Sequence, residues 1–496
     1  YPAAFAEVLS VGGGNQRGLH EYRYLDGCVP EYEARGDLQR VCWRGGREVL
    51  ASGTSFAAPH LTGIVALIRQ ALPGADLEQV RQVLRLHAVA SVPRSPSPDP
   101  AQGRDAALEQ RHPRRGSRHG WIRRAVLYPF NKEMHALVRG RDLLGFSIAG
   151  VADPPGKGLV GRDAGEVLGL PATGLPIRAR LEAALTETEA DTLILGCVDE
   201  LGRLAQRDLL RECVAQALDR GLNVFSLLSV RPETYPDLHA QAESRGLRLV
   251  YPGLPPAEVA AAVELSSSAA PITAPVLGVF GTSSQQGKFT LQLELRRQLL
   301  AAGYRLAQVG TEPHAELFGM DLAFPMGYAS PLDLPLQLYV PYLDGSLKAI
   351  CRAVIPDLVL VGCQSGTIPY DLGEHAAGSL VSLAFLLGTR PDAGILVVNP
   401  ADPPEYVRDT IAALAAVAGT RTLGLAVSDR TREIGERGGR TWLAQRLLTR
   451  DEVASVLARL EAESGLPSAC IGDPEGVARL VTEVVRCFAE TKGGER

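Results

Sequence analysis

Short apolar runs alternate with amphipathic stretches along the chain from Trp121 onward. The run RRAVLYPF (123–130) is followed by the amphipathic stretch NKEMHALVRGRDLL (131–144), and the run FSIAGVADP (146–154) comes next. Strands that alternate with helices build a parallel sheet, because each crossover helix returns the chain to the same end of the sheet. The pattern therefore predicts an α/β fold with parallel sheets for this part of the chain.

The alternation is interrupted at SSSAAPITAP (266–275), which we interpret as a domain boundary. Residues 121–265 are predicted to form a Rossmann-like parallel-sheet domain. No GxGxxG follows its first strand, so dinucleotide binding is not predicted there. Residues 276–490 are predicted to form a second α/β domain, with buried strands at 276–281, 305–310, 356–362, 393–400 and 422–428, and with helices at 288–302, 403–418, 450–464 and 474–490.

The chain has 496 residues, a length typical of about three domains. Residues 91–120 are rich in Pro, Ser and Arg, the composition of a disordered linker. The net charge of −5 gives no general attraction for nucleic acid or anionic lipid. The longest apolar runs, such as LVSLAFLLG (380–388), are too short to span a bilayer. We expect neither a nucleic-acid partner nor a membrane span.

Eight cysteines are scattered along the chain without a CxxC motif. This spacing predicts neither a disulfide framework nor a structural zinc site, and no other metal-ligand pattern is apparent. Most of the thiols are expected to be buried in a reducing compartment, and no signal peptide is recognised, so the predicted location is the cytoplasm. The chain begins with Tyr, and we expect its natural start to lie further upstream.

A glycine-rich turn lies between the strand VLGVFG and the helix that starts at Lys288. Backbone N–H groups in such a turn point at an anion, and a lysine at the helix start adds a positive charge. The spacing from Gly281 to Gly287 and Lys288 is one residue longer than GxxxxGK[ST] and resembles the GTDxxxGKT loop of dethiobiotin-synthetase-like P-loop proteins. Phe289 replaces the usual Thr, which leaves Thr290 as the expected magnesium hydroxyl. The resemblance implies ATP or another nucleotide with Mg²⁺ as the ligand.

The acid that normally orders the metal is missing from its expected place. Gly362 and Cys363 follow the strand PDLVLVG, and Asp357 comes too early, at the start of that strand. Asp321 and Glu312 are the alternatives that we consider. Without such an acid, the loop is predicted to bind a nucleotide or another anion with little turnover.

Near the start of the chain, ASGTSFAAPHLTG (51–63) places Ser55 before an apolar helix. An isolated GTS is explained by a serine or threonine that caps the helix. The longer motif GTSFAAPHLTG, however, closely resembles the nucleophile motif of subtilisin-like serine proteases, and the helices after it match that family as well. The resemblance covers residues 1–90, the C-terminal part of a subtilisin-like peptidase domain. It implies that Ser55 is a catalytic nucleophile that needs no cofactor.

The other catalytic motifs of that family are not found in residues 1–90. The family order is Asp, His, Ser, whereas His20 precedes both Asp26 and Asp37. Asn15 follows the YPA element, although the oxyanion Asn of the family precedes it, and His60 is a packing residue of the Ser motif. A truncated domain with Ser55 but no base or oxyanion donor is predicted to be inactive by itself.

A second resemblance covers residues 121–490. The stretches that carry it are similar to bacterial peptide-maturation system proteins, which pair a Rossmann-like half with a P-loop half. They are YPFNKEMHALV (128–138), VGTEPHAELFGMDLAFPMGYASP (309–331), PDLVLVGCQSGTIPYD (356–371) and FLLGTRPDAGILVVNPADPPEYVRDTIAAL (385–414).

Together these resemblances imply a fusion in which a serine-type endopeptidase segment is joined to a peptide-maturation protein. Its expected partner is a peptide or precursor-peptide substrate derived from a ribosomally made, modified peptide. Two alternatives remain open. One is a nucleotide-dependent ligase, kinase or acyltransferase that uses the P-loop. The other is a non-catalytic module that binds a precursor peptide or an anion.

Overall fold

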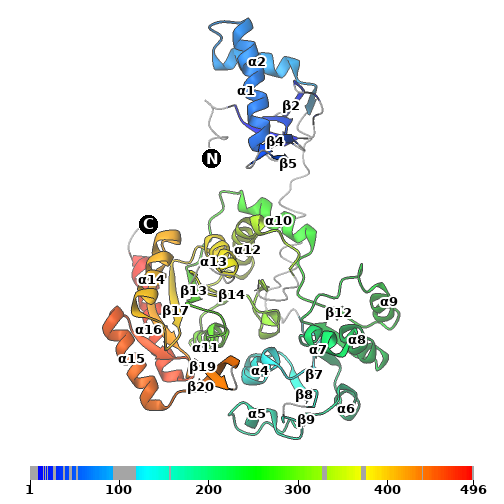
Figure 1. The fold of residues 1–496 in the computed structure, drawn as a ribbon, viewed down its shortest axis with the longest axis vertical. Helices are drawn as coiled ribbons and strands as arrows, with labels where there is room; N and C mark the ends of the chain where they lie inside the picture. Colours follow the sequence, from blue (N-terminus) through cyan, green and yellow to red (C-terminus); the bar gives the residue numbers. More distant parts are fainter. Residues whose placement is uncertain are drawn as a thin grey trace. The chain divides into compact units, whose positions relative to one another are not determined.

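The computed structural model describes residues 9–14, 16, 18, 20–25, 30–36, 39–43, 47–51, 54–92, 119–155, 158–326, 332–369, 376–437 and 440–493. The chain divides into two compact units, Tyr1–Gly103 and Arg104–Arg496 (Figure 1). Each unit has its own buried core, and each is described by itself below.

The first unit contains a small mixed sheet with the strand order β1-β3-β2-β6. β1 is parallel to β3, β3 is antiparallel to β2, and β2 is parallel to β6. A separate hairpin joins β4 to β5. The strands are β1 (Val11–Gly14), β2 (Tyr22–Leu25), β3 (Tyr32–Arg35), β4 (Gln39–Trp43), β5 (Arg47–Ala51) and β6 (Ala90–Val92).

Two helices complete this unit. Helix α1 (Thr54–Ala71) packs on β1 and β3, and its buried residues Ala57 and Leu61 meet Tyr32 in the core. Helix α1 includes a proline, Pro59, in its second turn. Helix α2 (Leu77–His87) has Asp76 as its N-cap, whose side chain accepts a hydrogen bond from the Gln79 N–H at 2.8 Å.

Strand β6 pairs with β2 through residue 92, so the sheet of the first unit reaches the first two residues of the predicted linker. Backbone hydrogen bonds to the sheet thus extend the first unit into the Pro- and Ser-rich stretch. Residues 93–118 lie outside the described residues, so the rest of the predicted linker stays a prediction.

The second unit opens with a parallel sheet that confirms the predicted alternation. Within the described residues the strand order is β12-β11-β10-β7-β8-β9, and all neighbouring pairs are parallel. The strands are β7 (Arg124–Tyr128), β8 (Ser147–Ala152), β9 (Ile177–Arg178), β10 (Thr192–Leu195), β11 (Asn223–Ser226) and β12 (Leu249–Val250). The helices are α4 (Lys132–Arg139), α5 (Ala164–Val167), α6 (Leu181–Glu187), α7 (Asp199–Ala205), α8 (Leu209–Asp219) and α9 (Pro236–Ser244).

A second parallel sheet has the order β15-β14-β16-β13-β17-β18-β21 among the described strands. Every neighbouring pair in it is parallel. The strands are β13 (Val276–Gly281), β14 (Leu306–Gly310), β15 (Leu322–Ala323), β16 (Leu358–Gly362), β17 (Ala393–Val398), β18 (Arg421–Val427) and β21 (Ser468–Cys470). The strands predicted around 276, 305, 356, 393 and 422 are thus confirmed.

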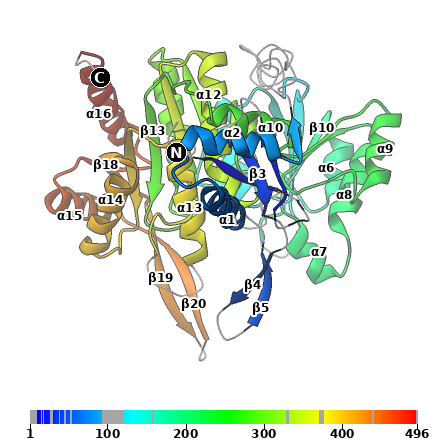
Figure 2. The same cartoon turned by 90° about the horizontal axis from the view of Figure 1, so that it is seen from above.

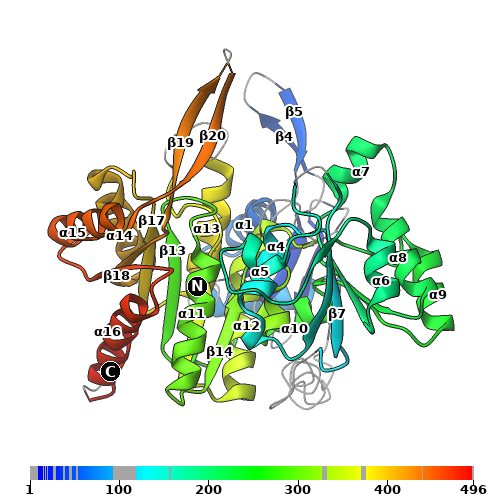
Figure 3. The same cartoon turned by 90° about the horizontal axis from the view of Figure 1, so that it is seen from below.

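Helices cover both faces of this sheet (Figures 2 and 3). One face packs against α11 (Lys288–Ala301) and α16 (Pro474–Gly493). The other packs against α10 (Pro256–Ser266), α12 (Tyr339–Val354), α13 (Ala376–Thr389), α14 (Pro404–Ala418) and α15 (Arg450–Ser464). Central strand β13 alternates between the two cores, since Val276 and Phe280 face one and Leu277 and Val279 the other. Helix α10 precedes the predicted boundary at 266–275, yet its Ala262 lies in the core of this second sheet.

An antiparallel hairpin, β19 (Arg430–Arg437) and β20 (Arg440–Leu447), extends from the second sheet between β18 and α15 (Figure 3). The sequence patterns did not predict it. No helix within the described part of the chain is both long enough and apolar enough to cross a bilayer.

Candidate phosphate-binding site

The glycine-rich loop, defined here as residues 281–288, connects β13 to α11. Gly287 immediately precedes α11 and has a φ of +93°, a left-handed conformation that favours glycine. Gly281 ends β13 against the Lys288 side chain, because a Cβ built on Gly281 would lie 3.0 Å from Lys288 Cδ. Both predicted glycines therefore occupy positions where a larger residue would strain or crowd the loop.

Lys288 is the first residue of α11 and is only 5% exposed. Its ammonium nitrogen lies 2.6 Å from the carbonyl oxygen of Ser283, so the side chain folds back over the loop. The positive end of the α11 dipole is at the same place. One turn therefore brings together the predicted residues Gly281, Gly287 and Lys288, and its positive charge favours an anion.

A carboxylate on the neighbouring strand end holds the loop. The Thr282 hydroxyl donates to Asp402 Oδ2 at 2.5 Å, and the Asn399 N–H donates to the same oxygen at 2.8 Å. Burial raises the pKa of the Asp402 carboxyl above its usual range, and the hydrogen bond from Thr282 acts against that shift. The turn after β17 therefore contacts the glycine-rich loop directly.

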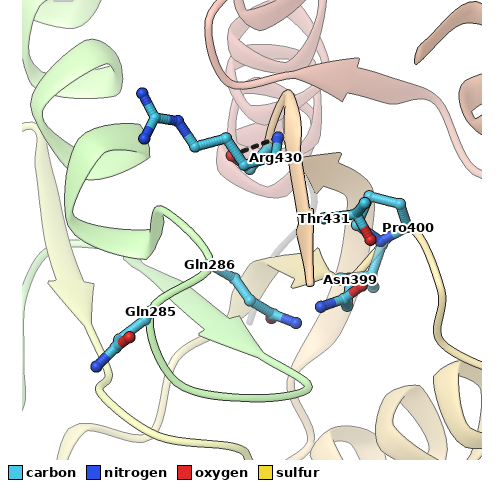
Figure 4. Close-up of a pocket in the computed structure, with 8 residues that line it drawn as sticks. Gln285, Gln286, Asn399, Pro400, Arg430 and Thr431 are labelled. Atoms are coloured by element: carbon cyan, nitrogen blue, oxygen red, sulfur yellow. Dashed lines mark hydrogen bonds between the residues drawn. The ribbon is translucent and has the colours of Figure 1, made fainter. Parts of the chain in front are cut away.

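A pocket lies beside the loop (Figure 4). The carboxamides of Gln286 and Asn399 point toward each other across it, and the backbone N–H of Arg430 donates to Ser428 Oγ at 3.2 Å on its other side. The pocket is lined by Gln285, Gln286, Val398, Asn399, Pro400, Ser428, Arg430 and Thr431. It is a small recess of mixed polar and apolar lining at the carboxyl ends of β17 and β18, the edge of a parallel sheet where ligands bind.

Phe289 takes the place of the hydroxyl residue that follows the lysine in most such loops. Its ring packs against His314 at 4.9 Å and against Phe318 at 5.6 Å between centroids. Phe318 belongs to a core that also contains Phe130 of the first parallel-sheet domain, so Phe289 joins the two domains. Thr290, the predicted magnesium hydroxyl, is exposed in the first turn of α11.

Strand β16 lies beside β13 and ends without an acid, as the sequence indicated. Cys363 is buried at this position, and burial raises the pKa of its thiol to about 11. The carboxamide of Gln292, from the second turn of α11, covers Gly362: a Cβ there would lie 1.8 Å from Gln292 Nε2. A neutral thiol and a neutral amide therefore fill this strand end.

The alternative acids lie elsewhere. Asp357 pairs with Arg305 at 2.9 Å at the amino end of β16. Asp321 accepts the Gln308 N–H at 2.8 Å and precedes β15, three strands from β13 and roughly 14 Å away. Glu312 follows β14, and its charge acts on Lys132 and on Glu133 of the first domain.

A cluster of titratable groups surrounds Lys132 and Glu133. Lys132 Nζ lies 3.3 Å from Glu133 Oε1, and burial raises the pKa of Glu133. Burial also raises the pKa of the Cys197 thiol to about 12. His314 is buried, and neither of its ring nitrogens has a hydrogen-bond partner among the described residues. Burial lowers its pKa to about 3, with a smaller effect from the Lys132 charge.

In the first unit, α1 begins at Thr54, so the backbone of Ser55 lies in the first helical turn. The Ser55 side chain is outside what the structure describes, as are Gly53, Asn15, Asp26 and Asp37. His20 is exposed, and His60 lies on α1 itself. The role of Ser55 therefore stays a prediction from the motif.

Family comparisons agree with this division of the chain. Residues 265–481 match a model described as a domain of unknown function (DUF1611_C) P-loop domain. The second parallel-sheet domain is a P-loop domain. Residues 157–250 match a domain of unknown function (DUF1611_N) Rossmann-like domain, and residues 1–116 match the subtilase family.

Known proteins are similar to parts of the chain. A crystal structure of a DUF1611 family protein from Anabaena variabilis has a TM-score of 0.54 and 19% identity, and the likeness covers 74% of this chain and 99% of that one. It shows that the Rossmann-like and P-loop arrangement is a known fold. An ADP complex of a nucleotide-binding protein from Archaeoglobus fulgidus has a TM-score of 0.29 and 15% identity, over 44% of this chain and 90% of that one.

At the sequence level, a thermostable alkaline protease from Halalkalibacterium halodurans is 34% identical over 97 residues. These make up 20% of this chain and 26% of the protease, so the chain spans about a quarter of the length of that relative. The match supports a subtilase-like segment at the start of the chain, and no more than a segment.

Sequence reasoning missed the partners of the P-loop on the β17 side. Asp402 and Asn399 contact or face the loop although more than 110 residues separate them from Gln286. The available signal was the polar stretch NPAD directly after a buried strand, because strand ends of a parallel sheet meet at one edge.

Proposed function

We propose that the P-loop domain binds the phosphate groups of a nucleotide-containing ligand at residues 281–288. The observation that carries the proposal is the geometry of Lys288. Its ammonium group lies 2.6 Å from Ser283 O at the start of α11, next to a left-handed glycine. Backbone N–H groups, the helix dipole and one cation then converge where phosphate oxygens are best stabilised.

The pocket beside the loop offers hydrogen-bonding groups to the part of the ligand next to the phosphates. Its lining combines the amides of Gln286 and Asn399 with the Arg430 backbone and small apolar surfaces. Amides can both donate to and accept from a heterocycle or a sugar hydroxyl. A nucleotide whose phosphates sit in the loop would extend toward this recess.

Calorimetric titration of the whole chain with ADP tests the proposal. Wild type should bind, and Lys288→Ala should lose at least about tenfold in affinity, or 1.4 kcal/mol. Arg305→Ala is the matched control, because it removes a cation that is paired with Asp357 at the opposite edge of the sheet. Equal affinity of wild type and Lys288→Ala would refute phosphate binding in this loop.

A second function concerns the first unit. We propose that residues 1–90 are the nucleophile segment of a serine endopeptidase, with Ser55 attacking the peptide carbonyl. The subtilase match and the similarity to an alkaline protease support it. In a fusion with the P-loop protein, the proposed substrate is a precursor peptide that matures by proteolysis. The base and oxyanion donor have to come from residues other than the Ser55 motif.

Labelling with a fluorophosphonate probe separates the two functions. Probe attached at Ser55, and lost in Ser55→Ala, would support an assembled protease site. The P-loop variant Lys288→Ala should label like wild type. Proteolysis of a test peptide that is unchanged by Ser55→Ala would remove this proposal and leave the nucleotide proposal intact.

A nucleotide-dependent ligase, kinase or acyltransferase remains the enzyme class that the P-loop domain would support without the protease segment. These reactions differ in the fate of the nucleotide. After incubation with candidate peptides, ADP as the product indicates a kinase or an ADP-forming ligase, and AMP indicates an AMP-forming ligase. A nucleotide-containing acyl donor that keeps its phosphates indicates an acyltransferase.

A further inference from the structure

We propose that this P-loop holds the diphosphate of its ligand without a magnesium ion, so that the phosphate group serves as a handle and is not transferred or hydrolysed. The inference rests on phosphate binding at residues 281–288 and goes beyond it in naming the ligand: a molecule with a nucleoside diphosphate that stays intact. The proposal differs from the resemblance to P-loop proteins, which implied that Mg²⁺ binds together with the nucleotide.

Magnesium at a P-loop needs particular donors. It takes the hydroxyl of the residue after the lysine and is ordered by a carboxylate on a neighbouring strand, with water and phosphate oxygens completing an octahedron. Here the residue after Lys288 is Phe289, whose ring is packed against His314 and Phe318. That position supplies a domain contact in place of an oxygen ligand.

The neighbouring strand does not provide the carboxylate either. At the end of β16, Cys363 is 2% exposed and its pKa of about 11 keeps the thiol protonated at neutral pH. A thiol is a soft ligand, and magnesium prefers hard oxygen donors. Gly362 has no side chain and has no space for one, because Gln292 lies over it.

Gln292 is the second observation that points to a changed site. It lies one turn after Lys288 on α11 and is 1% exposed. Neither its Oε1 nor its Nε2 has a hydrogen-bond partner among the described residues. A buried amide without partners destabilises the fold. It places a neutral group beside the lysine turn where a charged metal-ordering acid would be expected.

The other carboxylates near the loop do not form a metal-binding cluster. Within the described part of the chain, no group of three or more His, Cys, Asp and Glu side chains is positioned to hold a metal ion. Asp402 contacts the loop, but its Oδ2 already accepts the Thr282 hydroxyl and the Asn399 N–H. Asp402 thus stabilises the conformation of the loop.

The charge available at the loop sets the ligand. Magnesium ordinarily neutralises the β- and γ-phosphate oxygens of a triphosphate. Without magnesium, only Lys288 and the helix dipole compensate the negative charge of the phosphates. A diphosphate, which carries less negative charge than a triphosphate, is therefore favoured. A nucleoside diphosphate linked to a group that reacts at a distance from the phosphates fits this site better than a phosphoryl donor does.

Titration of the whole chain with ADP and with ATP, each in excess EDTA and in millimolar MgCl₂, tests the inference. The ADP affinity should change by less than about threefold between the two buffers, and ATP should bind no tighter than ADP. No phosphate should be released from ATP. Affinity at least about tenfold tighter in MgCl₂ would overturn the inference.

Variants locate any metal effect that is seen. Thr290→Val and Asp402→Asn should both leave the ratio of affinities in the two buffers unchanged. A magnesium-dependent gain in wild type that disappears in either variant would identify that residue as a metal ligand and contradict the proposal. Absence of ADP binding in both buffers would instead refute the phosphate site itself, so the two failures are distinguishable.

Discussion

The hydroxyl of Thr282 and the carboxylate of Asp402 are 2.5 Å apart, although 120 residues separate them in the chain. This bond ties the P-loop to the turn after β17. The Tyr406 hydroxyl, on α14, also lies 2.9 Å from the Thr282 carbonyl oxygen. The loop is therefore held in place from the β17 side by Asp402 and Tyr406, which lie outside residues 281–288.

Removing the hydroxyl of Thr282 tests this bracing. Thr282→Val leaves the half-buried Asp402 carboxyl without its closest donor, so we expect a loss of about 1 kcal/mol in the free energy of unfolding and weaker ADP binding. Urea denaturation followed by circular dichroism measures the first effect. Thr290→Val is the matched control, because Thr290 is exposed, and it should stay within about 0.5 kcal/mol of wild type. Equal stability of both variants would mean that the short contact does not hold the loop.

The contact between Gln292 and Gly362 makes a second prediction. A methyl group at Gly362 would lie 1.8 Å from Gln292 Nε2 in a fully buried site, so Gly362→Ala should cost about 1–3 kcal/mol of stability. Gln292→Ala removes the obstacle. The double variant should therefore be about 1 kcal/mol more stable than the sum of the two single changes predicts. Strict additivity in the denaturation cycle would contradict the contact.

The strand, loop and first helix of the P-loop could be predicted because their signals are local. VLGVFG is a continuous apolar run, and Gly287 and Lys288 stand at the turn into the helix. Helix α12 was missed for a physical reason. Its buried face includes the ion pair of Lys348 and Asp344, at 2.9 Å, which interrupts the apolar period of a helix. The role of Asp402 was missed because its partner, Thr282, is distant in sequence.

Asp321 gives a prediction about pH. Burial raises its pKa from 3.8 to about 6, while the Gln308 N–H and Arg296 act in the opposite direction. In this window the folded state keeps a proton that the unfolded state has lost, so this carboxyl makes stability fall as pH rises from about 4 to 6. The slope is at most about 1.4 kcal/mol per pH unit.

Asp321→Asn isolates that contribution, since an amide oxygen can still accept the Gln308 N–H. As pH rises from about 4 to 6, the unfolding free energy of wild type should fall relative to that of Asp321→Asn. Above about pH 6 the difference should stay constant. Denaturation at several pH values checks this. A difference that is constant from pH 4 to 7 would show that the carboxyl titrates normally.

His314 predicts the opposite pH dependence. Burial holds its pKa near 3 in the folded state, whereas the unfolded value is 6.5. Below pH 6.5 the unfolded state binds a proton that the folded state does not, so stability is lost as pH falls, by up to about 1.4 kcal/mol per pH unit. Because neither ring nitrogen has a partner among the described residues, His314→Leu should be as stable as wild type or more stable at pH 7.

The same variant should lose less stability than wild type between pH 6.5 and pH 4, because it has no imidazole to protonate. His239→Leu is a useful contrast: His239 Nε2 lies 2.7 Å from the Val230 carbonyl oxygen, so its removal should destabilise at pH 7. If His314→Leu is instead destabilised by several kcal/mol at pH 7, the ring makes a hydrogen bond that matters to the junction of the two domains. Parallel urea titrations of the three proteins at each pH decide between these outcomes.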